Sequence, residues 1–90
     1  MNRHAESERR ALDLIAHFAD RLSARDAELL SEMATHNEWG VAFENLCSII
    51  DYDWERLTTE DIALLESVGA EWQRPDDPIN WPKLRSLVTD

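Results

Sequence analysis

The side chains best suited to chemistry in this sequence are two histidine–carboxylate pairs and one cysteine. Asp13 and His17 stand four residues apart, as do Glu32 and His36, so each pair shares one face of a helix. Either pair could give a metal ion two ligands, but a metal site needs a third and usually a fourth. The alternative is an exposed pair that stabilises its helix weakly. We expect no metal site here.

Catalytic motifs are absent from the sequence: there is no Gly-rich phosphate loop, paired-cysteine motif or nucleophile elbow. Cys47, the only cysteine, lies beside an apolar stripe and near negative charge, which disfavours the reactive thiolate. We therefore expect Cys47 to be a packing residue, and we expect no catalytic residue, no cofactor and no enzymatic activity.

A run of alternating acidic and aromatic residues points to binding: Asp51, Tyr52, Asp53, Trp54 and Glu55. Carboxylates pair with lysine and arginine, and aromatic rings bury area at low entropic cost, a mixture typical of interface hot spots. We predict that this run contacts a partner, with Tyr52 facing outward more than Trp54. The alternative is that one ring packs inward and the acids only solvate a helix end.

The charge is unevenly distributed along the chain. The formal net charge is −10, and residues 26–77 hold fourteen of the 19 acids against two arginines. Such a field attracts a cationic partner, at rates that fall as salt screens the charges, and it repels phosphates. The charge argues for a basic protein partner and against nucleic acid.

The N-terminal apolar stretch is too broken to serve in a membrane. Asp13, His17 and Asp20 interrupt it, so we expect neither a signal-peptide core nor a membrane span. A single cysteine fits a reducing compartment. We expect a cytoplasmic protein.

Low Gly and Pro content and three-to-four spacing of apolar residues predict an all-α fold. We expect a compact single-domain bundle over residues 1–90, with helices at 6–22, 25–36, 38–51 and 59–68 and a short C-terminal helix opened by Asn80, Trp81 and Pro82. The first two helices should form an antiparallel hairpin. Their predicted inward residues are Ala11, Leu12, Ile15, Phe18, Ala19 and Leu22, then Leu29, Leu30 and Met33.

The boundaries of the expected helices follow from capping residues. Ser23 should cap the second helix and Asn37 the third, Thr58 and Asp61 should form a capping box with Leu57 stapled onto Ile62, and Gly69 should end the fourth helix. Residues 73–78, with two prolines, should form a loop in which Asp76 and Asp77 either recognise a partner or solvate a turn.

The third helix should have two distinct faces. Its predicted core face is Trp39, Ala42, Phe43, Leu46, Ile49 and Ile50, and its presented face is Glu44, Ser48, Asp51 and Tyr52 with Val41 and Asn45 beside them. Glycine at position 40 lowers the stability of the helix by about 1 kcal/mol relative to alanine. A close approach by another backbone, from this chain or from a partner, would explain why glycine is present. In the remaining helices the predicted inward residues are Leu64, Leu65, Val68, Trp81, Leu84 and Leu87 or Val88.

The string at residues 37–47, Asn-Glu-Trp-Gly-Val-Ala-Phe-Glu-Asn-Leu-Cys, together with the capped helix that follows, resembles the MafI-type immunity proteins of polymorphic-toxin and contact-dependent inhibition systems. The matching positions are Glu38, Gly40, Ala42, Glu44 and Leu46, and the resemblance covers roughly residues 31–71. It implies a small acidic bacterial protein that binds and silences the toxic C-terminal domain of a secreted toxin, often a nuclease. A motif shared by proteins that face different toxins cannot distinguish those toxins, so we interpret Ala42 and Leu46 as scaffold.

The sequence thus predicts an immunity protein that blocks a basic toxin domain, an RNase or DNase, by means of an acidic and aromatic face. The alternative is an acidic helical adaptor or homodimeric module with no toxin partner. The residues predicted to bind the partner are Glu44, Ser48, Asp51, Tyr52, Asp53, Trp54, Glu55, Asp76 and Asp77.

Overall fold

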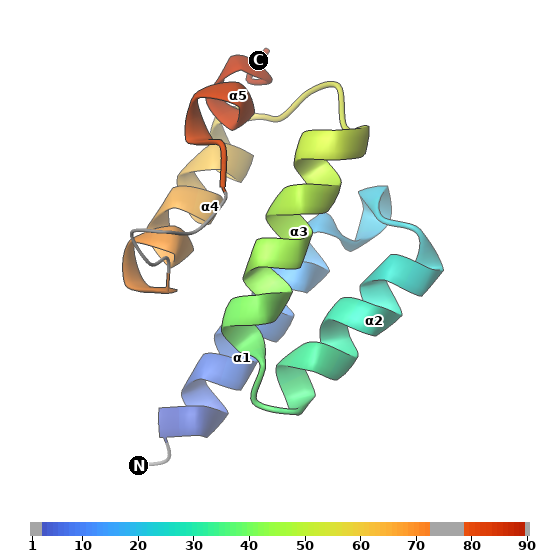
Figure 1. Ribbon diagram of the computed structural model, residues 1–90, viewed down its shortest axis with the longest axis vertical. Helices are drawn as coiled ribbons and strands as arrows, with labels where there is room; N and C mark the ends of the chain where they lie inside the picture. Colours follow the sequence, from blue (N-terminus) through green and yellow to red (C-terminus); the bar gives the residue numbers. More distant parts are fainter. Residues whose placement is uncertain (1–2, 73–78, 90) are drawn as a thin grey trace. The chain divides into compact units, whose positions relative to one another are not determined.

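The computed structural model describes residues 3–72 and 79–89, and the fold is all-α (Figure 1). The elements in chain order are α1 (Arg3–Phe18), the 3-10 turn η1 (Ala19–Arg21), α2 (Ala24–Thr35), α3 (Trp39–Asp53), α4 (Thr59–Trp72) and α5 (Trp81–Ser86). The prediction of four longer helices and a short C-terminal one is confirmed. The chain divides into two compact units, residues 1–46 and 47–90, with the boundary inside α3. A single domain over residues 1–90 stays a prediction.

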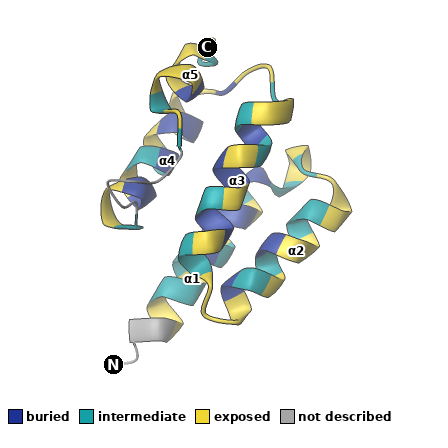
Figure 2. Ribbon diagram, in the orientation of Figure 1, coloured by how far each residue is buried: buried dark blue, intermediate teal, exposed yellow. Residues whose placement is uncertain are grey.

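In the N-terminal unit, α1 and α2 pack against each other, and α2 runs back along α1 (Figure 1). Ser23 caps α2, because its Oγ accepts a hydrogen bond of 3.0 Å from the Asp26 main-chain N–H, as predicted. Each helix has a buried side and an exposed side (Figure 2). The buried apolar residues are Ala11, Leu14, Ile15 and Phe18 of α1, Leu30 and Ala34 of α2, and Ala42, Phe43 and Leu46 of α3. Leu14 was not among the predicted core residues.

The inward face of α2 differs from the prediction. Leu30 and Ala34, four residues apart, are buried, whereas Leu29 is 44% exposed and Met33 is half-buried. Each helical residue turns the side-chain direction by about 100°, so a core line through Leu30 and Ala34 places Leu29 and Met33 on its flank. The prediction that Leu29 faces inward is therefore wrong.

Asn37 ends α2 rather than capping α3. Its φ of 63° is in the left-handed region, which asparagine tolerates better than most residues, and the next N–H, that of Glu38, donates to the Met33 carbonyl at 2.9 Å. The first helical hydrogen bond of α3 runs from the Ala42 N–H to the Glu38 carbonyl, so α3 starts one residue later than predicted. The N-cap prediction for Asn37 is wrong, because the left-handed backbone of this residue turns the chain between α2 and α3.

Gly40 lies in the first turn of α3 with an ordinary negative φ. A Cβ built at this position would meet no atom of the chain within 4 Å. The predicted close approach of an internal backbone is therefore not found, and only an approach by a foreign one stays open as a prediction.

In the C-terminal unit, α4 opens at the predicted capping box. The Thr58 N–H donates to Asp61 Oδ2 at 2.9 Å, and the Asp61 N–H donates to Thr58 Oγ1 at 3.0 Å. Gly69 was predicted to end this helix, but it is buried inside α4, which continues to Trp72, and no described glycine has a positive φ. Burial of Val68 and Gly69 offsets the helix cost of glycine, so the local stop signal is overridden.

A backbone pairing that the sequence did not predict closes the C-terminal unit. Leu57 forms a parallel bridge with Val88: the Leu57 N–H donates to the Leu87 carbonyl at 2.8 Å, and the Thr89 N–H donates to the Leu57 carbonyl at 3.2 Å. The buried apolar residues of this unit are Cys47, Ile50, Leu57, Ile62, Leu65, Val68 and Leu84. The residues of this unit that were predicted as core but are only half-buried are Ile49, Leu64, Trp81, Leu87 and Val88; in the N-terminal unit they are Leu12, Ala19, Leu22, Met33 and Trp39.

Candidate functional site

The end of α3 carries the acidic and aromatic run. We define the α3 tip as Ser48, Asp51, Tyr52, Asp53, Trp54 and Glu55. A helical hydrogen bond of 3.0 Å still runs from the Trp54 N–H to the Ile50 carbonyl. The residues that follow lie outside the helix. The tip thus combines the last turn of a helix with the first residues of a loop.

Exposure separates the two aromatic residues of the α3 tip. The Tyr52 side chain is 92% exposed, whereas Trp54 is half-buried, in the order that the sequence predicted. Asp53, Glu55 and Ser48 are exposed as well. Tyr52 projects almost wholly into solvent, so it contributes nothing to a core and is accessible to a partner protein.

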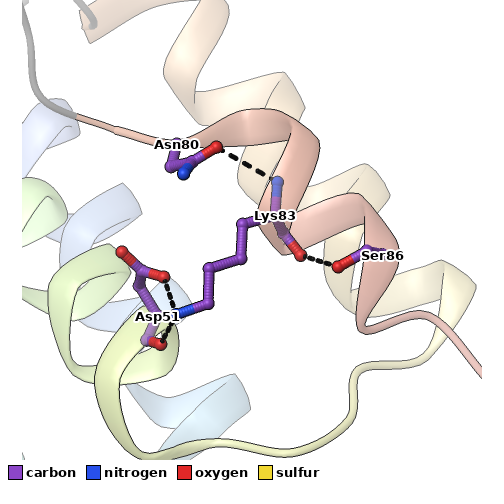
Figure 3. Close-up of polar contacts among 4 residues, drawn as sticks. All are labelled: Asp51, Asn80, Lys83 and Ser86. Atoms are coloured by element: carbon purple, nitrogen blue, oxygen red, sulfur yellow. Dashed lines mark hydrogen bonds and ion pairs between the residues drawn. The ribbon is translucent and has the colours of Figure 1, made fainter.

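Asp51 differs from the other acids of the tip because it is engaged within the chain (Figure 3). The Lys83 ammonium lies 2.6 Å from Asp51 Oδ1 and donates a hydrogen bond of 2.6 Å to the Asp51 main-chain carbonyl. Oδ1 itself is buried and accepts no hydrogen bond of regular geometry, so its contact with the ammonium is an ion pair only. The Asp51 charge is therefore offset from inside the molecule.

Lys83 belongs to α5, which is held at both ends. The Asn80 Oδ1 caps the helix by accepting a hydrogen bond of 3.2 Å from the Lys83 N–H, and the Ser86 hydroxyl donates to the Lys83 carbonyl (Figure 3). Arg85 donates to Glu66 Oε2 of α4 at 2.9 Å. The short helix thus ties the end of α3 to α4, and it fixes the base from which Tyr52 projects.

One hollow beside the α3 tip is very small. This hollow, lined by Cys47, Ser48, Asp51, Ile79 and Asn80, has a volume of only about 10 Å³. This is roughly the space of one water molecule, so the hollow cannot hold a substrate or cofactor.

Three further predicted binding residues, Glu44, Asp76 and Asp77, are not part of the α3 tip as defined above. Glu44 is half-buried in the part of α3 that belongs to the N-terminal unit. Near it, Val41 is 45% exposed and Asn45 is exposed, with the Asn45 amide donating to the Val41 carbonyl at 2.8 Å. Asp76 and Asp77 lie outside the described residues.

A larger hollow, which the sequence analysis did not anticipate, lies in the N-terminal unit. Its volume is about 350 Å³, and we call it the α2 hollow; it is lined by Leu29, Glu32, Met33, His36 and Glu38. The signal that could have found it is the position of Leu29 and Met33 beside the line through Leu30 and Ala34. A core position for Leu29, as predicted, would leave no hollow at this face of α2.

Turn geometry sets the rim of the α2 hollow. The left-handed Asn37 brings Glu38 back over the last turn of α2, where its N–H bonds the Met33 carbonyl. His36 Nδ1 lies 2.7 Å from the Glu32 carbonyl, which can only accept, so this ring nitrogen is the donor. These bonds hold the backbone of the turn, and the exposed residues Glu32 and Glu38 line the hollow together with Leu29 and Met33.

The histidine–carboxylate pairs do not gather further ligands. Among residues 3–72 and 79–89, no group of three or more His, Cys, Asp or Glu side chains is arranged to hold a metal ion. Cys47 is buried, in agreement with the packing role expected for it. Within the same ranges, every helix is too short or too polar to cross a bilayer.

Comparison of the chain with protein-family models, with curated proteins and with solved structures gave no match in any of the three. The function must therefore be argued from the residues and their arrangement.

Proposed function

We propose that this chain is a cytoplasmic immunity protein, which binds and neutralises a basic toxin domain, a nuclease, of a bacterial contact-dependent or polymorphic toxin system. The observation that carries the proposal is Tyr52, which is 92% exposed and is followed closely by the exposed carboxylates Asp53 and Glu55, in a chain of net charge −10. The resemblance of residues 37–47 to MafI-type immunity proteins supports the same conclusion.

Tyr52 is the energetic centre of the proposed contact. Exposed ion pairs contribute only about 0–1 kcal/mol each, whereas a nanomolar complex needs about 12 kcal/mol. Acids alone cannot supply that affinity, so a ring must become buried in the complex. Tyrosine is among the residues most enriched at such hot spots, and Tyr52 is the exposed aromatic side chain of the α3 tip.

Asp53 and Glu55 act by competition with the substrate of the toxin. A nuclease presents lysine and arginine to phosphates, and carboxylates held on a helix end can occupy the same cations. The α3 tip has three acids, Asp51, Asp53 and Glu55. Because Asp51 is paired with Lys83, we assign the competing charge to Asp53 and Glu55. Asp51 instead orients the tip by tying it to α5.

The test pairs this chain with a basic toxin domain encoded just upstream, which should kill alone and be harmless when this chain is coexpressed. Tyr52→Ala should weaken the purified complex by at least about 30-fold, because it removes the ring that becomes buried. Asp53→Lys with Glu55→Lys should slow association by at least about tenfold at low salt. Both changes should abolish protection in cells.

The matched control reverses two exposed acids elsewhere, Asp13→Lys with Asp20→Lys, which alters the net charge by the same amount. It should retain most of the affinity. If both charge swaps acted equally, or if neither affected binding and its salt dependence, competition at the α3 tip would be refuted. If this chain neither bound the toxin domain nor protected cells, the alternative of an adaptor or homodimer without a toxin partner would gain, and sedimentation of the chain alone would reveal a homodimer.

A further inference from the structure

The α2 hollow combines apolar and acidic side chains. Its floor includes Leu29, one of the few large apolar side chains that are exposed, and the half-buried Met33. Its rim carries the exposed carboxylates of Glu32 and Glu38. A solvated acidic face would not need the apolar floor, and a core position would not carry the acids.

We infer that the α2 hollow is a docking site for an arginine side chain of a partner protein. The aliphatic stem of the arginine lies on Leu29 and Met33, and its guanidinium pairs with Glu32 and Glu38. Long cationic side chains place their stems on apolar surface while the charged head meets acids or water. Methionine adapts its shape to such a stem because it is unbranched.

Arginine fits this hollow better than lysine does. The two carboxylates come from different places, Glu32 from the body of α2 and Glu38 from the turn after it. A guanidinium offers five donors in a planar fork, so one head can engage both acids, and it is more weakly hydrated than an ammonium. The volume of about 350 Å³ is at the lower end of small-molecule pockets, which suits one long side chain.

Two other occupants are disfavoured by the same residues. A second copy of this chain would bring a net charge of −10 against an acidic rim. A metal ion would need the three titratable side chains of the hollow to converge, and among the described residues no such group does. The site lies wholly in the N-terminal unit, so the inference does not depend on the α3 tip or on a toxin.

The experiment uses the full chain and three capped tripeptides, acetyl-Gly-X-Gly-amide, in which X is arginine, lysine or glutamine. Backbone amide chemical shifts are followed by NMR during each titration. The arginine peptide should shift the amides of residues 29–38 with millimolar affinity, at least threefold more tightly than the lysine peptide. The glutamine peptide should shift them little.

Variants then assign the effect to the hollow. Glu32→Gln with Glu38→Gln should weaken arginine binding at least fivefold, as should Leu29→Ser, whereas Asp13→Asn with Asp20→Asn, which changes the net charge equally, should alter it less than twofold. Unchanged amide spectra away from the hollow show that each variant is folded. Equal binding of the glutamine or lysine peptide, shifts outside residues 29–38, or equal loss in the control would each overturn the inference.

Discussion

Single residues in this chain often serve a different purpose from the one that their type indicates. Asn37 has the type of an N-cap but supplies a left-handed turn, and Leu29 has the type of a core residue but lines a hollow. Asp51, one of five consecutive residues predicted to bind, is paired with Lys83. The surroundings determine the role of each residue. Asn37 lies where the chain turns, Leu29 lies beside the buried Leu30, and Asp51 lies next to Lys83 of α5.

Gly40 allows the sharpest prediction at this scale. Because an added Cβ would meet nothing within 4 Å and φ is negative, Gly40→Ala should stabilise the protein by up to about 1 kcal/mol by restricting the unfolded chain and favouring the helix. Urea denaturation measures this. Ala16→Gly, at an exposed site of α1, is the reverse control and should destabilise by a similar amount.

The same variant tests whether a foreign backbone approaches Gly40. If it does, Gly40→Ala should weaken partner binding while it stabilises the free protein. Loss of stability in the free chain would show that the space around Gly40 is not open.

At the scale of elements, local signals placed the starts of α2, α4 and α5 well, but not the start of α3 or the end of α4. Ser23, Asn80 and the Thr58–Asp61 box all cap the helices that they were expected to cap. A cap works through side-chain atoms within three residues, so the sequence contains the whole interaction. The end of α4 depends on burial around Val68 and Gly69, which distant residues supply.

The capping box of α4 should be measurable in stability. Thr58→Ala removes the acceptor of the first-turn N–H of Asp61, and Asp61→Ala removes the acceptor of the N-cap N–H of Thr58, so each should lower the free energy of unfolding by about 1 kcal/mol. Asp61→Asn keeps a side-chain oxygen acceptor and should cost less. Ser67→Ala, at an exposed position within α4, should change stability by less than about 0.5 kcal/mol in the same urea titrations.

The candidate site was predictable only in part, because some of its contacts join residues that are far apart in the sequence. Apolar spacing and turn chemistry gave the all-α fold and the projecting Tyr52, since both depend on neighbours along the helix. The pairing of Lys83 with Asp51 and the bridge of Leu57 to Val88 join residues about thirty positions apart. No spacing rule in a single sequence indicates such partners, and the α2 hollow went unseen because it depends on which of two adjacent leucines is buried.

The whole molecule carries a charge large enough to influence its own stability. With 19 acids against 9 lysines and arginines, the folded chain concentrates like charges that the unfolded chain spreads out. The ion pairs Lys83–Asp51 and Arg85–Glu66 relieve some of this repulsion in the C-terminal unit, but both are partly exposed and hence weak.

Salt should therefore stabilise the protein. Raising NaCl from about 0.01 M to about 1 M shortens the screening length from about 30 Å to about 3 Å and should raise the midpoint of thermal unfolding by several degrees. Neutralising three exposed acids, by Asp13→Asn, Asp20→Asn and Glu28→Gln, should reduce that rise. A midpoint that falls with salt, or a rise unchanged in the variant, would contradict self-repulsion as its cause.

The bridge between Leu57 and residues 87–89 also bears on the time course of folding. α1 and α2 are joined by a few residues and can pack as soon as they form. The bridge of Leu57 to Val88 forms only after the chain of α4 and α5, which lies between the two residues, has brought them together. Closing the longer loop costs more chain entropy and delays the event. Pulse-labelled hydrogen exchange should thus protect the amides of α1 and α2 before those of Leu57 and Thr89, so that the base of the α3 tip matures last.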